Sequence, residues 1–216
     1  MNNKHKEILN IVNEKLTCSA HNMDHIIRVY EQCLIIAKYE NNVDMEILVA
    51  AALLHDIARV EESHDKTGTI DHAILGAEIA ADILNTLGYN KETIKAIHHC
   101  IVTHRFRTGN LPLTIEAKIL FDADKLDAIG AVGIARTFML SGQFGQRLST
   151  SVKYDNNNSS GNGRIKDMAN HTPFIEYELK LKKIPEKLYT KKAIEIGKSR
   201  ILFMDNFFKT LKSEID

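Results

Sequence analysis

The sequence predicts a single all-α domain. Hydrophobic residues recur with the helical period of about 3.6 residues along nearly the whole chain. Strand signals are few, because the β-branched residues fall into the same helical period. At 216 residues the chain is long enough for one well-buried domain and short for two, so we expect one domain over residues 1–216.

Five amphipathic helices are predicted in the N-terminal half. Asp44, Asp71 and Asn90 are the expected N-caps, because a side-chain oxygen at this position can accept hydrogen bonds from the first-turn amides. Gly88 stands where the fourth helix should end. The apolar stripes of the five helices cover residues 8–16, 26–37, 47–58, 73–84 and 94–101.

A further helix is predicted from about residue 114 through residue 135. Gly130 and Gly133 lower its stability, so we expect them to permit close backbone packing. Residues 149–170 are rich in Asn, Ser and Gly and are expected to form a polar loop within the domain. The C-terminal helices are predicted over residues 172–212, beginning at Thr172 as N-cap and Pro173 as first residue.

The composition excludes several classes of protein. Lys plus Arg and Asp plus Glu number 28 each, so no basic excess indicates a nucleic-acid or membrane partner. Three cysteines are too few for a disulfide framework. The N-terminus lacks the apolar core of a signal peptide, and no run approaches the roughly 18 apolar residues of a membrane span. We expect a reduced, cytoplasmic setting and a small-molecule substrate.

Histidine is concentrated in one part of the chain. Eight of the ten histidines lie between positions 21 and 104, where an even spread would place about four. The excess suggests a use for imidazole in this region, although surface histidines with one or two buried ones would give the same count.

Two His-Asp pairs occur, and their surroundings differ. His55-Asp56 lies in the nearly apolar stretch AALLHDIA, so both residues should be buried, and a buried carboxylate needs a cationic partner or a metal. An arginine partner for Asp56 and a carbonyl partner for His55 would be the purely structural alternative. His64-Asp65 lies in a polar run and is expected to be a solvated loop.

Further metal ligands must come from other helices. Neighbouring residues on a helix point about 100° apart, so His55 and Asp56 alone cannot surround an ion. His25 and Asp124 have suitable chemistry. Asp124 and Asp127 share a helix face, so their mutual repulsion favours a nearby cation, which Lys125 supplies only in part.

Three segments in this order, HNMDHIIRVY, LLHDIAR and DADKLDAIGAVGIARTF, resemble the HD superfamily of metal-dependent phosphohydrolases. The resemblance spans about residues 21–140. It implies a helical bundle of the HD-domain type with a metal at its centre, and metal ligands at His25, His55, Asp56 and Asp124.

The resemblance also implies an activity, the hydrolysis of a phosphoester or phosphoanhydride of a nucleotide or another small phosphorylated metabolite. Two imidazoles and two carboxylates suit a divalent transition metal, with Mn²⁺ favoured by the family likeness and Fe²⁺, Co²⁺, Ni²⁺ or Zn²⁺ also compatible. A non-catalytic metal-binding regulatory module and a nucleotide second-messenger hydrolase are the alternatives.

One position departs from the family pattern. Some members carry a glutamate three residues after the HD aspartate, where this chain has Arg59. Water activation must then depend on the metal itself, on Asp56 or on an imidazole such as His72. Asp127, which could hold the metal ligands in place, is a further candidate catalytic residue.

Cationic and imidazole groups near these motifs are candidates for binding the substrate phosphate: Arg59, His104, Arg105 and Lys125. A salt bridge from Arg59 to Glu61 or Glu62 and a solvent-facing Arg105 are the structural alternatives. Dinuclear members of the superfamily imply a possible second ion at His72, His99 and His104.

Overall fold

The protein is described by a computed structural model that covers residues 1–16, 23–105, 109–148 and 171–215. Every regular element in these ranges is helical, which confirms the all-α prediction. None of the described helices has the length and apolar character required to span a lipid bilayer. The predicted loop at 149–170 lies outside the described residues.

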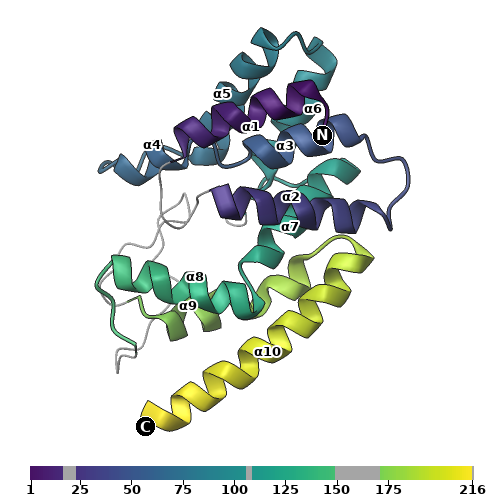
Figure 1. The fold of residues 1–216 in the computed structure, drawn as a ribbon. Helices are drawn as coiled ribbons and strands as arrows, with labels where there is room; N and C mark the ends of the chain where they lie inside the picture. Colours follow the sequence, from purple (N-terminus) through teal and green to yellow (C-terminus); the bar gives the residue numbers. More distant parts are fainter. Residues whose placement is uncertain (17–22, 106–108, 149–170, 216) are drawn as a thin grey trace. The chain divides into compact units, whose positions relative to one another are not determined.

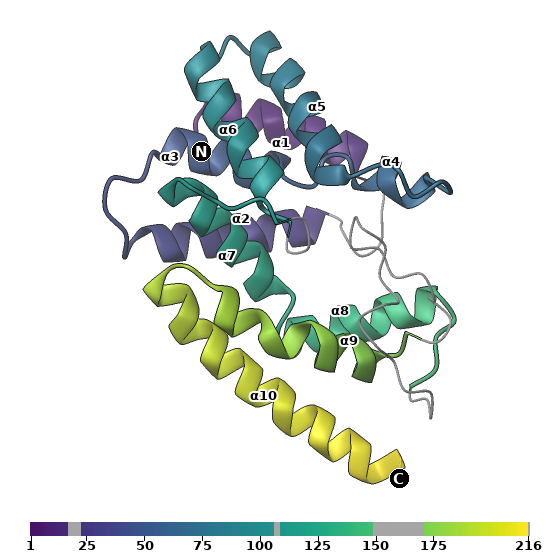
Figure 2. The ribbon, with the colours of Figure 1, turned by 180° about the vertical axis from the view of Figure 1, so that it is seen from behind.

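The chain divides into two compact units, residues 1–124 and 125–216, and the boundary falls inside one helix, α7. The expectation of a single domain stays a prediction. In the first unit, α3 (Met45–Leu54) is packed by α1 (Asn3–Lys15), α2 (Met23–Ala37), α5 (His72–Thr86) and α6 (Lys91–Thr103) (Figures 1 and 2). Residues 48–54 of α3 are all buried, so this helix forms the core.

The predicted N-caps are confirmed. Asp44 Oδ1 accepts hydrogen bonds from the amides of Glu46 and Ile47 at 2.9 and 3.2 Å, and Asp71 and Asn90 cap α5 and α6 in the same way. Gly88 follows the end of α5 with a φ of 70°, a conformation that favours glycine.

The helix predicted through residue 58 ends earlier. α3 stops at Leu54, and α4 (Arg59–His64) begins after a turn at residues 55–58. Within this turn, the amides of Ile57 and Arg59 donate to carbonyls three residues back, at Leu54 and Asp56. Apolar periodicity continues across the turn, which is why the sequence did not reveal the break. The polar run before His64 forms α4, so the expectation of a loop there is wrong.

The helix predicted over residues 114–135 is also divided. α7 (Ile115–Asp127) ends before Ala128, and α8 (Gly130–Gln143) begins at Gly130, which has a φ of 79°. Gly133 lies against the new bend: a Cβ there would be 2.2 Å from the Ala128 carbonyl oxygen. The close backbone approach expected at Gly133 is present. Its partner is the Ala128 carbonyl in the bend between α7 and α8.

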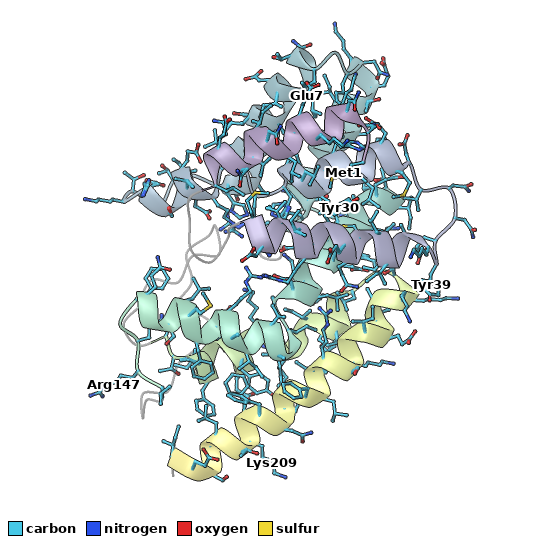
Figure 3. All side chains as sticks on the ribbon, in the orientation of Figure 1. Met1, Glu7, Tyr30, Tyr39, Arg147 and Lys209 are labelled. Atoms are coloured by element: carbon cyan, nitrogen blue, oxygen red, sulfur yellow. The ribbon has the colours of Figure 1, made fainter. Side chains whose placement is uncertain are left out.

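The second unit contains α8, α9 (Pro173–Leu179), the 3₁₀ helix η2 (Leu181–Lys187) and α10 (Lys191–Ile215). Thr172 is the N-cap of α9 and Pro173 its first residue, as predicted. Phe208 is buried, and its ring stacks on Tyr177 with centroids 4.3 Å apart. Lys209, the next residue on α10, is exposed (Figure 3).

Candidate metal centre

His55 and Asp56 lie in the turn between α3 and α4, and both side chains are buried, as predicted. His55 Nδ1 lies 2.9 Å from the carbonyl oxygen of Ala52. Since a carbonyl only accepts hydrogen bonds, Nδ1 carries the proton and donates it. The other ring nitrogen of His55, Nε2, therefore presents a lone pair.

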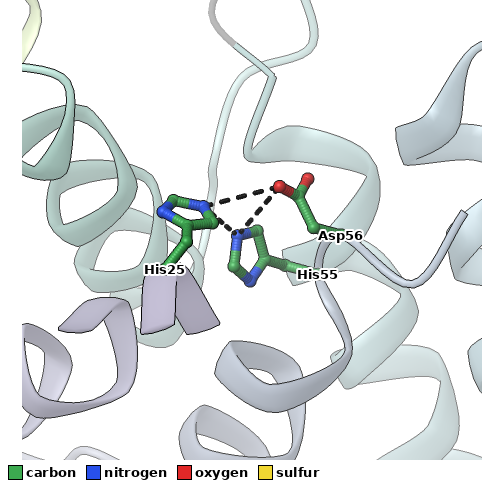
Figure 4. A group of neighbouring side chains, drawn as sticks. All are labelled: His25, His55 and Asp56. Carbon is green, nitrogen blue, oxygen red and sulfur yellow. Dashed lines mark hydrogen bonds and ion pairs between the residues drawn. The ribbon is translucent and has the colours of Figure 1, made fainter. Parts of the chain in front are cut away.

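His25, His55 and Asp56 form a first cluster, and the His55 lone pair points toward the other two residues (Figure 4). His25 Nε2, from the start of α2, lies 3.3 Å from His55 Nε2 and 3.4 Å from Asp56 Oδ2. His55 Nε2 is 3.7 Å from the same oxygen. Asp56 Oδ2 is buried and has no hydrogen-bond partner among the described residues. A buried carboxylate oxygen left in this way suits a cation at the centre of the three groups.

Asp124 reaches the same place from α7. It is buried, and its Oδ1 lies 3.4 Å from His25 Nε2. Asp124 does not belong to the group of His25, His55 and Asp56 whose ligand atoms all lie close together, and it approaches that group at His25. The four residues expected as ligands come from three separate parts of the sequence.

A second cluster, Asp56, His72 and His104, shares the aspartate. The Nε2 atoms of His72 and His104 lie 3.2 Å apart, and each is 3.5 Å from Asp56 Oδ1. His104 Nδ1 lies 2.5 Å from the Ile101 carbonyl and must donate to it. His72 Nδ1 lies 3.0 Å from a carboxylate oxygen of Glu62, which likewise can only accept while ionised.

The two Nε2 atoms of the second cluster are therefore both unprotonated and face each other. Lone pairs at this distance repel, and a cation between them would relieve the repulsion. The donor set, two imidazoles and one carboxylate oxygen, is compatible with a divalent transition metal.

Burial keeps His55 and His72 neutral. It is the main cause that lowers the pKa of His55 to about 4 and that of His72 to about 3. Burial alone would raise the pKa of Asp56, but the positive charge of Arg59 holds it well below its usual range. Neutral imidazoles beside an ionised carboxylate are the protonation states that metal binding requires.

Two arginines lie beside the second cluster. Arg59 donates from Nε to Asp56 Oδ1 at 2.9 Å and from Nη1 to Glu62 Oε2 at 3.0 Å, so the expected salt bridge to Glu62 is present. Arg105 Nη1 lies 2.9 Å from Glu62 Oε1 and 3.0 Å from Asp71 Oδ1. The alternative of a solvent-facing Arg105 is wrong, because its side chain is only 11% exposed.

His99 is absent from both clusters of the described residues. Its Nε2 accepts a hydrogen bond from the Leu113 amide at 3.0 Å. The expected second-ion set of His72, His99 and His104 stays a prediction, and the second cluster of the described residues contains Asp56 and not His99. His99 lies five residues before His104, beyond the spacing at which residues of one helix share a face.

The second His-Asp pair takes no part in either cluster. His64 is exposed, and Asp65 accepts hydrogen bonds from the amides of Thr67 and Ile70, both at 2.8 Å. These contacts hold the loop after α4.

Lys125 and Asp127 belong to the second unit. Both are buried, and Asp127 Oδ2 accepts a hydrogen bond from Arg136 Nη1 at 2.5 Å. The cation that the sequence required beside Asp127 is thus an arginine. This pairing removes the electrostatic reason for placing Asp127 at a metal.

The sequence did not indicate that Glu62 contacts residues of the second cluster. Its spacing from Arg59 predicts only an ion pair on one helix. Its contacts with His72 and Arg105 depend on residues 10 and 43 positions away, which no local pattern indicates. Two residues of the histidine- and arginine-rich region, His21 and Arg107, lie outside the described residues.

Comparison with known proteins identifies the family of this chain. The model of the HD domain family matches residues 22–129. YpgQ of Bacillus subtilis strain 168, an uncharacterised protein, is 32% identical over 201 residues, which cover 91% of this chain and 85% of YpgQ.

Solved structures give the same result. The crystal structure of Bacillus subtilis YpgQ in complex with ADP matches with a TM-score of 0.74 and 29% identity, covering 98% of this chain and 94% of that one. A predicted HD superfamily hydrolase from an uncultured Thermotogales bacterium has a TM-score of 0.64 and 31% identity, with 98% and 92% covered. An HD-superfamily hydrolase from Bacillus thuringiensis has a TM-score of 0.68 and 26% identity, with 98% and 96% covered. These neighbours suggest a hydrolase.

Proposed function

Because the chain belongs to the HD domain family, we propose that it is a metal-dependent phosphohydrolase. The reaction is the hydrolysis of a phosphoester or phosphoanhydride bond in a nucleotide or another small phosphorylated metabolite. The observation that carries the proposal is the buried Asp56 carboxylate, which directs Oδ2 at His25 and His55 and Oδ1 at His72 and His104. A nucleotide substrate is supported by the relative YpgQ, whose crystal structure contains ADP.

His25, His55, Asp56 and Asp124 would hold the principal ion. The orphan Oδ2 of Asp56 and the Nε2 lone pair of His55 fit this role. Mn²⁺ is the favoured metal, and Fe²⁺, Co²⁺, Ni²⁺ and Zn²⁺ also suit the imidazole and carboxylate donors. When bound, the ion would polarise the phosphate and lower the pKa of a coordinated water. Asp56, His72 and His104 would hold a second ion.

The protein's own groups supply the rest of the chemistry. With one ion bound, His72 Nε2 is a proton acceptor for the attacking water, because its Nδ1 proton is held by Glu62. With a second ion bound, the same nitrogen and Asp56 Oδ1 would both be ligands, so neither would be available to accept this proton. Arg59 takes the place of the glutamate found in some family members and neutralises Asp56.

The substrate phosphate is assigned to Arg59, Arg105 and His104, all within residues 1–124, whereas Lys125, in the second unit, stays a prediction from the sequence. A guanidinium carries five N–H donors and can hold a carboxylate and a phosphate together. Arg105 is already oriented by Glu62 and Asp71 and therefore loses little further freedom when phosphate binds.

The first experiment measures the metal content of the purified protein and its turnover of nucleotides and sugar phosphates with added Mn²⁺. We expect metal to copurify and the double variant His55→Ala/Asp56→Ala to lose at least roughly 1,000-fold in activity, since the ion and its activated water are both lost.

Asp65→Ala is the matched control, because it removes the aspartate of the exposed His-Asp pair. Its activity should remain within about 2-fold of the wild type. Turnover that persists in the double variant would remove this site from the reaction. Bound metal without turnover of any phosphorylated compound would favour a regulatory metal-binding module.

A further inference from the structure

Glu62 connects three donors from three different segments. Its Oε2 lies 3.0 Å from Arg59 Nη1 and 3.0 Å from His72 Nδ1, and its Oε1 lies 2.9 Å from Arg105 Nη1. The Glu62 side chain is 11% exposed. A carboxylate held by three donors in a nearly dry place has a fixed orientation, and it fixes the orientation of its partners.

We propose that Glu62 is the positioning residue of the second cluster: it holds His72 in the tautomer with the proton on Nδ1, and so presents the Nε2 lone pair to Asp56 and His104. The proposal deepens the proposed function, on which its metal-binding part rests. The tautomer itself is a property of the metal-free protein.

Two contacts of His72 Nδ1 favour opposite tautomers. Arg105 Nη1, at 3.4 Å, can donate to Nδ1 only when this nitrogen is unprotonated, whereas the Glu62 oxygen, at 3.0 Å, accepts from a protonated Nδ1. The shorter contact, to an ionised carboxylate, favours the proton on Nδ1. A proton on His72 Nε2 would leave an Nδ1 lone pair 3.0 Å from a carboxylate oxygen. Burial alone would raise the pKa of Glu62, but the hydrogen bond from His72 and the charges of Arg59 and Arg105 hold it well below its usual range. Glu62 therefore stays ionised and can only accept a proton from His72.

His104 provides an internal comparison. Its Nδ1 proton is directed to the Ile101 backbone carbonyl at 2.5 Å, which no side-chain substitution removes. Of the two imidazoles in the second cluster, His72 alone depends on a side chain for its orientation. Removal of Glu62 should therefore change the tautomer of one histidine and leave the other unchanged.

The experiment is a long-range ¹H–¹⁵N correlation spectrum of the metal-free full chain at mildly alkaline pH, which reports the protonated nitrogen of each histidine. His72→Gln and His104→Gln identify the two sets of signals. We expect both histidines of the wild type to be protonated on Nδ1. In Glu62→Leu, His72 should lose this preference and become a mixture of tautomers, while His104 keeps its signals.

Two variants complete the series. Glu62→Gln keeps an oxygen that can accept from Nδ1 and should restore the wild-type tautomer. Glu61→Leu is the matched control, because Glu61 lies on the same helix and its side chain makes no hydrogen bond or ion pair with the described residues. It should leave both histidines unchanged. A wild-type His72 protonated on Nε2, or an unchanged His72 in Glu62→Leu, would overturn the proposal.

A folding defect does not obscure the result. Far-UV circular dichroism identifies it, and Glu62→Ala, which removes the same acceptor, then takes the place of Glu62→Leu. The wild-type spectrum is decisive without any variant at position 62, since the proposal requires Nδ1 protonation there.

Metal binding provides the second readout. Outer partners of ligating histidines typically contribute 10- to 100-fold in affinity. We expect Glu62→Leu to weaken the second equivalent of Mn²⁺ by roughly this factor in a calorimetric titration, and to change the first less than about 3-fold. A wild type that binds only one ion would contradict the two-ion form of the proposed function, while the tautomer result would still decide the role of Glu62.

Discussion

At the scale of single residues, Asp56 determines the arrangement of the site. One carboxylate serves two groups of imidazoles, because Oδ2 lies 3.4 Å from His25 Nε2 and Oδ1 lies 3.5 Å from the Nε2 atoms of His72 and His104. Burying its charge is costly, and Arg59 compensates for it at 2.9 Å. Asp56 is therefore the residue whose loss affects both clusters.

The neutral imidazole of His55 leads to a prediction for the metal-free protein. Its pKa is lowered to about 4 in the folded state from an ordinary value of 6.5. Between these values the unfolded chain binds the proton and the folded protein does not, so stability decreases as the pH falls from about 6.5 to about 4. The loss attributable to His55 should reach roughly 3 kcal/mol at most.

Urea unfolding at several pH values in this range, with a chelator present, measures this dependence. His55→Gln should make the dependence shallower and leave the contribution of His72, whose pKa is also lowered by burial, whereas His64→Gln, at an exposed position, should keep the wild-type slope. A wild-type stability that is independent of pH over this range would contradict the prediction.

At the scale of elements, two turns interrupt helices that the sequence predicts to be continuous. Each turn determines where the residues beside it lie. The turn at residues 55–58 places the His-Asp pair between α3 and α4, where its two side chains can serve different partners. The bend at residues 128–129 separates α7 from α8, and it brings the Ala128 carbonyl against Gly133.

Gly133 and Gly142 of α8 should respond oppositely to the same substitution. In Gly133→Ala, the new Cβ would lie 2.2 Å from the Ala128 carbonyl oxygen, so we expect a loss of about 3 kcal/mol as the bend shifts. No atom of the described residues lies within 4 Å of a Cβ at Gly142, so Gly142→Ala should stabilise the helix by about 0.5–1 kcal/mol. Urea unfolding of both variants tests this, and equal effects would argue against the described bend.

At the scale of the whole molecule, the site collects distant parts of the chain within residues 1–124. His25, the His55-Asp56 pair, His72, His104 and Asp124 come from different segments, and α3 provides the buried core beside them. A ligand that binds such a site only in the folded state stabilises the fold by mass action.

Metal addition should therefore raise the thermal unfolding midpoint. At 100 times its dissociation constant, Mn²⁺ should add about 2.7 kcal/mol of stability, and a chelator should reverse the gain. His25→Ala should abolish the response, whereas His98→Ala, at a half-buried position outside both clusters, should retain it. Differential scanning calorimetry with and without Mn²⁺ measures the shift, and an unchanged midpoint in the wild type would contradict metal binding at this site.

The sequence by itself determined the all-α class, the N-caps at Asp44, Asp71 and Asn90 and the burial of the His55-Asp56 pair. These features depend on local hydrogen bonding and on a hydrophobic period that can be read over a few turns. The ligand set followed from the resemblance to a family, because no local pattern connects His25 with Asp124.

Only the tertiary structure decided which groups meet. Two helices end earlier than predicted, and Asp56 belongs to both clusters. His99 accepts a hydrogen bond from a backbone amide, and Glu62 contacts His72 and Arg105. Apolar periodicity continues through the turns, so it does not mark them. The contacts themselves join residues that are distant in the sequence, and packing around α3, which no short segment encodes, brings them together.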